Sequence, residues 1–248
     1  MKKYFAKAFL GLCALGTSTV AFAQEAADAA QPAVESGMHQ ALKTKFIEGG
    51  ADFMSLVAIA LIFGLAFCLE RIIYLNLAET NPSKLLKGIE EALDRGDVEA
   101  AKTIARDTRG PIASIAYQGL MRIDQGVDIV EKSIVSYGGV QGGLLEKNLS
   151  WVTLFIAMAP SLGFLGTVVG MIMAFDKIEQ VGDISPTVVA GGMKVALITT
   201  VGGLIVALIL QIFYNYLLSK LESILNQMED ASISLIDLVI KYNLKFKK

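Results

Sequence analysis

The chain has 248 residues, of which 54% are hydrophobic and only 19% are charged, and its mean hydropathy is +0.54. A soluble domain carries about 25% charged and about 45–50% apolar residues, so this composition favours a membrane protein. The net charge of −2, the single histidine and the two cysteines argue against a basic nucleic-acid-binding surface, a His/Cys metal cluster and a disulfide framework.

The first 23 residues have the pattern of a secretory signal peptide. Three lysines near the start precede an apolar stretch, and residues 21–23 read Ala-Phe-Ala, a small-x-small cleavage pattern. We therefore expect residues 1–23 to be a signal peptide; the alternative is an uncleaved extra membrane anchor. Residues 24–37 are rich in Ala, Gln, Glu and Pro, which is typical of a flexible exported segment. We expect residues 24–50 to form a periplasmic N-terminal segment.

Three long stretches without a charged residue follow. A helix that crosses the hydrocarbon core needs about 20 apolar residues. The uncharged stretches contain 17, 28 and 25 residues and lie at 53–69, 148–175 and 195–219. Polar or snorkelling residues can extend such a helix at its ends. We therefore expect three transmembrane helices, at 51–77, 148–175 and 187–218.

Lysine and arginine residues are unevenly distributed between the connecting segments. Ten of them lie at 71–147 and five at 220–248, whereas the connection 176–186 has one. Because these residues accumulate on the cytoplasmic side, we expect a cytoplasmic helical domain at 78–147, a periplasmic loop at 176–186 and a cytoplasmic C-terminal helix at 219–248. A cleaved signal peptide also places the mature N-terminus outside, so both arguments predict a periplasmic N-terminus and a cytoplasmic C-terminus.

The cytoplasmic segments have helical patterning. Apolar residues such as Leu85, Ile89 and Leu93 recur at helical spacing, and Asp97 is placed to cap a helix that begins at Val98. No useful strand alternation is present, so the sequence predicts an all-α membrane protein with long cytoplasmic helical extensions. A nucleophile beside a base, a metal cluster and a phosphate loop are all lacking in the sequence. We therefore expect neither an enzyme nor a cofactor.

Small residues line one face of the second and of the third span. They are Gly163, Thr167, Gly170 and Ala174 in the second span, and Ala196, Thr200, Gly203 and Ala207 in the third. Lipid gives no hydrophobic reward for contact between helices, so close backbone approach along small faces must supply it. We expect Gly163, Gly170, Ala196 and Gly203 to be helix-packing residues, either within one chain or between the subunits of an oligomer.

Polar residues inside these spans are the candidate functional groups. Thr167, Thr199 and Thr200 cannot all face lipid comfortably, and Pro160 removes a backbone hydrogen bond and predicts a kink in the second span. Lys194 is the one ionisable residue well inside a span. Two interpretations are open for it: a snorkelling lysine, or a functional lysine that faces a polar cavity or an acidic partner.

Within the predicted membrane spans, acidic residues occur only near the ends. A proton relay through a bilayer normally needs a carboxylate or histidine at depth. If this protein takes part in proton conduction, the titrating carboxylate must therefore come from another chain.

The second and third spans resemble the ExbB/TolQ/MotA family of proton-channel motor subunits. The resemblance is carried by Ala-Pro-Ser-Leu-Gly-Phe-Leu-Gly-Thr-Val-Val-Gly-Met at 159–171 and by Ala-Gly-Gly-Met-Lys-Val-Ala-Leu-Ile-Thr-Thr-Val-Gly-Gly-Leu at 190–204. Residues 92–101 also look like the cytoplasmic helical turn of the family. The predicted topology and charge pattern are those of ExbB and TolQ, whereas MotA-type stators have an additional helix. Within the family, the similarity is closest to ExbB.

This resemblance implies a homo-pentamer in the bacterial inner membrane, with the second and third spans around a central pore. It also implies an ExbD-like single-span partner that carries an intramembrane aspartate, and a TonB-like protein that is energised for transport across the outer membrane. Thr167 and Thr199 match the pore-facing threonines of the family and Pro160 matches its kink. We include Thr200 and Lys194 in the candidate ion pathway.

Lys194 departs from the family pattern, because ExbB and TolQ commonly have a glutamate at this position. A lysine can only pair with the partner's aspartate or lower its pKa, so the proton path and the ion remain open. The alternatives to an ExbB-like role are a TolQ-like envelope subunit, a gliding-type motor subunit, or a non-conducting membrane scaffold.

Overall fold

The computed structural model describes residues 38–182 and 186–246, and all regular structure in these two ranges is helical. The predicted signal peptide lies outside the described residues. The chain divides into two units, Met1–Ile47 and Glu48–Lys248. Helix α2 (Met38–Glu48) lies in the first unit except for its last residue, Glu48, which belongs to the second. All other helices belong to the second unit, which contains the candidate site.

Three helices of the second unit are long and apolar enough to cross a membrane. They are α3 (Ala51–Ala78), α8 (Leu149–Val181) and α9 (Pro186–Phe246). Their most apolar windows have mean hydropathies of 2.4, 1.9 and 2.4, and only 28%, 22% and 28% of the residues in these windows are buried within the chain. The predictions of an all-helical fold and of three long apolar helices are therefore confirmed. Most of this apolar surface is left for lipid or for other chains.

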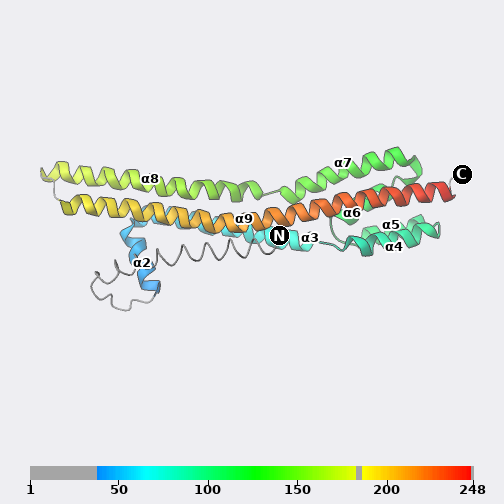
Figure 1. Cartoon of the computed structure of the whole chain (residues 1–248), viewed down its shortest axis with the longest axis horizontal. Helices are drawn as coiled ribbons and strands as arrows, with labels where there is room; N and C mark the ends of the chain where they lie inside the picture. The colour runs from blue at the N-terminus through cyan, green and yellow to red at the C-terminus, as the bar shows by residue number, and fades with distance from the viewer. Residues whose placement is uncertain (1–37, 183–185, 247–248) are drawn as a thin grey trace, which may run out of the picture. The chain divides into compact units, whose positions relative to one another are not determined.

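Helices α8 and α9 run side by side, and α3 packs against both of them (Figure 1). Helix α9 has 61 residues and is continuous, which corresponds to a length of about 90 Å at the rise of an α-helix. Its first half belongs to the apolar three-helix bundle. Its second half is the central element of a smaller helical bundle.

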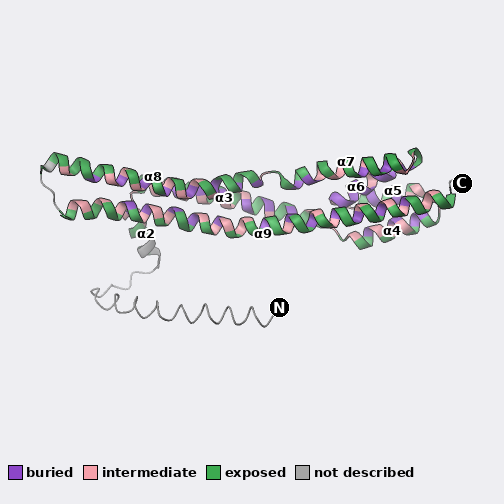
Figure 2. Ribbon diagram, turned by 45° about the horizontal axis from the view of Figure 1, so that its top comes forward, coloured by how far each residue is buried: buried purple, intermediate pink, exposed green. Residues whose placement is uncertain are grey.

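The smaller bundle is formed by α4 (Pro82–Asp94), α5 (Val98–Asp107), α6 (Pro111–Leu120), the short 3-10 helix η1 (Ile123–Gln125) and α7 (Val127–Glu146). Its core contains Ile89, Leu120 and Ile134, which have no exposed surface. In α4 and α7 the buried residues lie along one side and the opposite side is exposed, whereas α6 has no exposed residue and lies within the bundle (Figure 2). The Asp97 carboxylate accepts the N–H of Ala100 at 2.9 Å, which confirms the predicted cap of α5.

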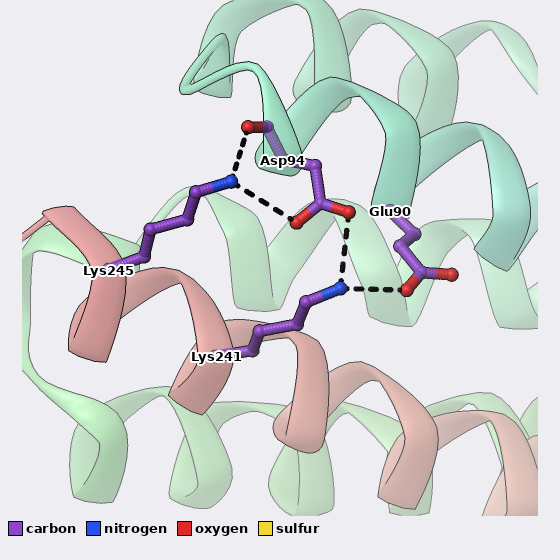
Figure 3. A network of polar contacts seen from close by, with 4 residues as sticks. All are labelled: Glu90, Asp94, Lys241 and Lys245. Carbon is purple, nitrogen blue, oxygen red and sulfur yellow. Dashed lines mark hydrogen bonds and ion pairs between the residues drawn. The ribbon is translucent and has the colours of Figure 1, made fainter.

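Ion pairs connect the C-terminal end of α9 to α4 (Figure 3). Lys241 Nζ lies 3.0 Å from Glu90 Oε1 and 3.1 Å from Asp94 Oδ2, and Lys245 Nζ donates to the carbonyl oxygen of Asp94 at 2.9 Å. The hydrogen bonds to Glu90 and Asp94 hold the pKa of Lys241 above its ordinary value. The network fixes the register of the α9 tail on α4.

The chain breaks between α7 and α8 at Asn148, which has a φ of 68°. Asparagine tolerates this left-handed conformation better than most residues. The guanidinium group of Arg71, on α3, lies against the break and donates from Nη1 to the carbonyl oxygen of Lys147 at 2.7 Å. Arg71 is only 3% exposed, pairs with the Glu70 carboxylate and stacks on the ring of Tyr74 at 4.4 Å. A buried cation therefore holds the last carbonyl before α8.

Candidate functional site

Helices α8 and α9 approach each other closely because glycines face one another along their contact. A Cβ atom added to Gly203 would lie 2.5 Å from the carbonyl oxygen of Ala159, and one added to Gly163 would lie 2.8 Å from that of Thr199. Two turns further along, a Cβ atom on Gly170 would lie 3.5 Å from the Cβ of Ala196. The two small-residue faces thus meet within a single chain. They are used for intramolecular packing, and so they give no separate argument for contacts between chains.

A pair of hydroxyl groups bridges this contact. Thr167 Oγ1 on α8 lies 2.5 Å from Thr200 Oγ1 on α9, and both side chains are half-buried. Each hydroxyl also lies within hydrogen-bond distance of the carbonyl oxygens of Gly163 and Ala196. Because a hydroxyl group can both donate and accept a hydrogen bond, the pair forms a polar link between two otherwise apolar helices.

Thr199 lies next to this pair but faces a different neighbour. Its side chain is fully buried, and its hydroxyl donates to the carbonyl oxygen of Ala196 at 2.8 Å. A Cβ atom added to Gly166 would lie 2.8 Å from Thr199 Oγ1, so the threonine fills the space that this glycine leaves on α8. In this conformation Thr199 packs α9 against α8. Contact of its hydroxyl with an ion would require α8 and α9 to separate at Gly166.

Lys194 lies apart from the three threonines and has an acidic neighbour in its own chain. Its Nζ atom is 2.8 Å from Glu48 Oε1, with 53% of the Lys194 side chain and 29% of the Glu48 side chain exposed. Sequence reasoning did not find Glu48, because this residue precedes the first span and nothing in the spacing connects it to Lys194. The available signal is that Glu48 is an acidic residue just before an apolar helix, which by itself does not identify Lys194 as its partner.

Pro160 lies inside α8, which is continuous from Leu149 to Val181. The proline has no N–H to donate to the preceding turn, while the neighbouring Ser161 hydroxyl donates to the carbonyl oxygen of Ala157 at 2.9 Å. The predicted kink at Pro160 stays a prediction.

A cavity of about 470 Å³ opens between the adjoining ends of α8 and α9. Its lining is mainly small and apolar, with one charged side chain, and includes Gly170, Met173, Lys177, Gly191 and Val195. Within residues 38–182 and 186–246, no group of three or more His, Cys, Asp or Glu side chains could hold a metal ion. The described site therefore offers hydroxyl groups, carbonyl oxygens and lysines, which suit the guidance of an ion or a partner helix better than bond-making chemistry.

These features define a membrane protein of three apolar helices with a polar link in its bundle. The chain belongs to the MotA/TolQ/ExbB proton channel family, whose model matches residues 107–230, half of the sequence. This segment contains α8, the apolar part of α9 and every candidate residue predicted above, whereas Glu48 lies outside it.

Individual relatives carry the ExbB name. The chain is 28% identical over 186 residues to an ExbB homolog of Methanothermobacter thermautotrophicus, an alignment that covers 74% of this chain and 65% of that protein. It is 37% identical over 89 residues to biopolymer transport protein exbB1 of Vibrio cholerae, covering 33% of this chain and 39% of the relative. It is 36% identical over 78 residues to biopolymer transport protein ExbB of Aquifex aeolicus, covering 32% and 53%. The chain thus spans less than two thirds of the length of these relatives.

Proposed function

We propose that the chain is an ExbB-like subunit of a motor or channel in the bacterial inner membrane, driven by the proton-motive force. With an ExbD-like single-span partner, it energises a TonB-like protein and thereby transport across the outer membrane. Membership of the proton channel family supports the ion-conducting role. The names of the relatives favour an ExbB-like role over a TolQ-like or gliding-type role.

The observation that carries this proposal is the Thr167–Thr200 hydroxyl pair between two glycine-faced helices. The pair lies in a part of the sequence that contains no carboxylate. A threonine hydroxyl can donate and accept hydrogen bonds, but it does not titrate in the ordinary pH range. A proton relay also needs a group that binds and releases a proton, such as a carboxylate. The ion pathway therefore combines the threonines of this chain with an intramembrane aspartate supplied by the partner. Each charge that crosses gains about 2.3 kcal/mol per 100 mV.

In this proposal five copies of the chain surround a central pore formed by α8 and α9, and the ion pathway follows Thr167, Thr199, Thr200 and Lys194. The apolar helices α8 and α9 also leave large side chains exposed, including Phe164, Leu208 and Ile212 at 67%, 65% and 71%. Such surface suits lipid or neighbouring subunits. The mature N-terminus, after removal of residues 1–23, is periplasmic, and the C-terminus is cytoplasmic.

The experiment is proton uptake into vesicles that contain the chain together with its co-purified partner. Replacing Thr167 by Val keeps the shape of the side chain and removes the hydroxyl. We expect uptake to fall about tenfold, as for the loss of a hydrogen bond worth about 1.4 kcal/mol in the conducting state.

The matched control is Thr153→Val, because Thr153 is an exposed residue of α8 whose hydroxyl bonds only to the carbonyl of Leu149 in its own helix. This variant should conduct like the wild type. The Thr199→Val variant then shows whether the buried threonine also meets the ion. Unchanged uptake in a combined Thr167→Val and Thr199→Val protein would overturn the proposed pathway.

A further inference from the structure

The Glu48–Lys194 pair connects the segment before the first apolar helix to the interior of the third. Lys194 is about 12 Å along α9 from its first residue, Pro186. Glu48 ends α2 and is followed by Gly49 and Gly50, after which α3 begins. The 2.8 Å separation of Lys194 Nζ and Glu48 Oε1 therefore joins two residues of the second unit that are distant in sequence.

A second set of contacts fixes the place of Glu48 beside α9. Gly50 has a φ of 80° and lies against Val195, since a Cβ atom added to it would be 3.6 Å from Val195 Cγ1. Further along the same side, Met54 packs on Gly202, where an added Cβ atom would be 3.1 Å from Met54 Cε. The start of α3 thus packs along α9 from Val195 to Gly202. The turn that precedes α3 places the Glu48 carboxylate beside Lys194.

The pair is asymmetric, because 53% of the Lys194 side chain is exposed against 29% of the Glu48 side chain. An ammonium group carries three N–H donors on a flexible stem, so a second carboxylate can approach Lys194 over its exposed side. A lysine without a counter-ion is unfavourable within a membrane span. Within a single subunit, Glu48 supplies the counter-ion that Lys194 needs. A carboxylate from another helix could take the place of Glu48.

We propose that Glu48 is the resident counter-ion of Lys194, and that the acidic residue of a single-span companion helix competes with Glu48 for this lysine. The identity of the companion rests on the proposed function, whereas the pair itself does not. When the companion's carboxylate is ionised, Lys194 turns to it. When that carboxylate takes up a proton, it becomes neutral and Lys194 returns to Glu48. Glu48 acts through Lys194 and not on the ion itself, so it is a positioning residue.

The pair is tested on the full-length chain in lipid nanodiscs without any companion. Unfolding midpoints are measured for the wild type, Glu48→Gln, Lys194→Met and the double variant. We expect the effect of Lys194→Met to shrink markedly once Glu48 is already Gln. The matched control replaces Glu179, an exposed acidic residue of α8, by Gln, and its effect should add to that of Lys194→Met. Additive effects for Glu48 and Lys194 would overturn the proposal.

The competition is tested with a synthetic single-span peptide of leucine and alanine that carries one aspartate in its outer third, and with the same peptide carrying asparagine. Binding of each to the nanodisc-embedded chain is measured by energy transfer. We expect Glu48→Gln to raise the preference for the aspartate peptide about fivefold, at the lower end of typical coupling between two ligands. Lys194→Met should abolish the preference, and the double variant should behave like Lys194→Met.

An unchanged or weaker preference in Glu48→Gln would overturn the competition. Proton uptake reports on the proposed function separately. If the chain with its co-purified partner moves no protons while Glu48→Gln still strengthens aspartate binding, the proposed function fails and the role of Glu48 stands.

Discussion

Arg71 is the residue on which the junction between the two bundles depends. Its guanidinium group is buried and donates to the Lys147 carbonyl, directly before the left-handed Asn148. The Arg71→Ala variant leaves this carbonyl without its donor, and such a loss costs about 1–3 kcal/mol of unfolding free energy. Arg71→Lys should recover only part of the loss, because an ammonium group lacks the planar fork that reaches Lys147 and Glu70 together.

Thermal or denaturant unfolding of the detergent-solubilised protein measures this effect. Arg109→Ala serves as the control, since Arg109 is exposed on the connection before α6 and should change stability by less than about 0.5 kcal/mol. Equal stability of the Arg71→Ala and Arg109→Ala proteins would contradict the role given to Arg71.

Single residues show clearly what the sequence could and could not predict. Thr167 and Lys194 were recognisable because a hydroxyl or an ammonium group is conspicuous in an apolar span. The ion pair of Lys194 with Glu48 and the contact of Arg71 with Lys147 were not recognisable, because each joins residues from distant segments. The burial of Thr199 against Gly166 was also missed, since helical spacing alone does not tell which side of α9 faces α8.

Among the contacts between helices, the one between α8 and α9 offers the most direct test. Gly163→Ala adds a methyl group where the Thr199 carbonyl oxygen lies 2.8 Å away, so the helices must move apart. We expect a loss of about 1–3 kcal/mol in unfolding free energy, as for other overpacked interiors. Unfolding of the purified protein provides the measurement.

Gly143→Ala is the matched control for this prediction. Gly143 is a helical glycine on α7, and an added Cβ atom there meets nothing within 4 Å. Alanine restricts the unfolded chain more than glycine does, so this substitution should stabilise the protein by about 0.5–1 kcal/mol. Opposite signs for the two substitutions support the close contact, and a stabilising effect of Gly163→Ala would refute it.

The helices themselves were largely predictable from the sequence. Three long uncharged stretches predicted three long apolar helices, and Asp97 marked the start of α5. The small-residue faces predicted close packing but left its partner open. The structure pairs the two faces within one chain, which periodicity could not decide because contact within and between chains requires the same small residues.

At the scale of the whole molecule, the chain belongs to the MotA/TolQ/ExbB proton channel family. In this chain, close glycine contacts and a pair of threonine hydroxyls hold α8 against α9. The long helix α9 joins this bundle to the smaller one, where Lys241 and Lys245 attach it to α4. One continuous helix thus contains Lys194 near one end and the attachment to α4 near the other.

In the proposed function, this protein supplies the wall of a proton pathway, and another polypeptide supplies the acid. The most direct measurement compares proton uptake into three sets of vesicles: with this chain alone, with the chain and its co-purified single-span partner, and with a partner whose intramembrane aspartate is replaced by asparagine. We expect uptake in the second set only. Equal uptake by the chain alone, or by the complex with the asparagine partner, would contradict the proposed function.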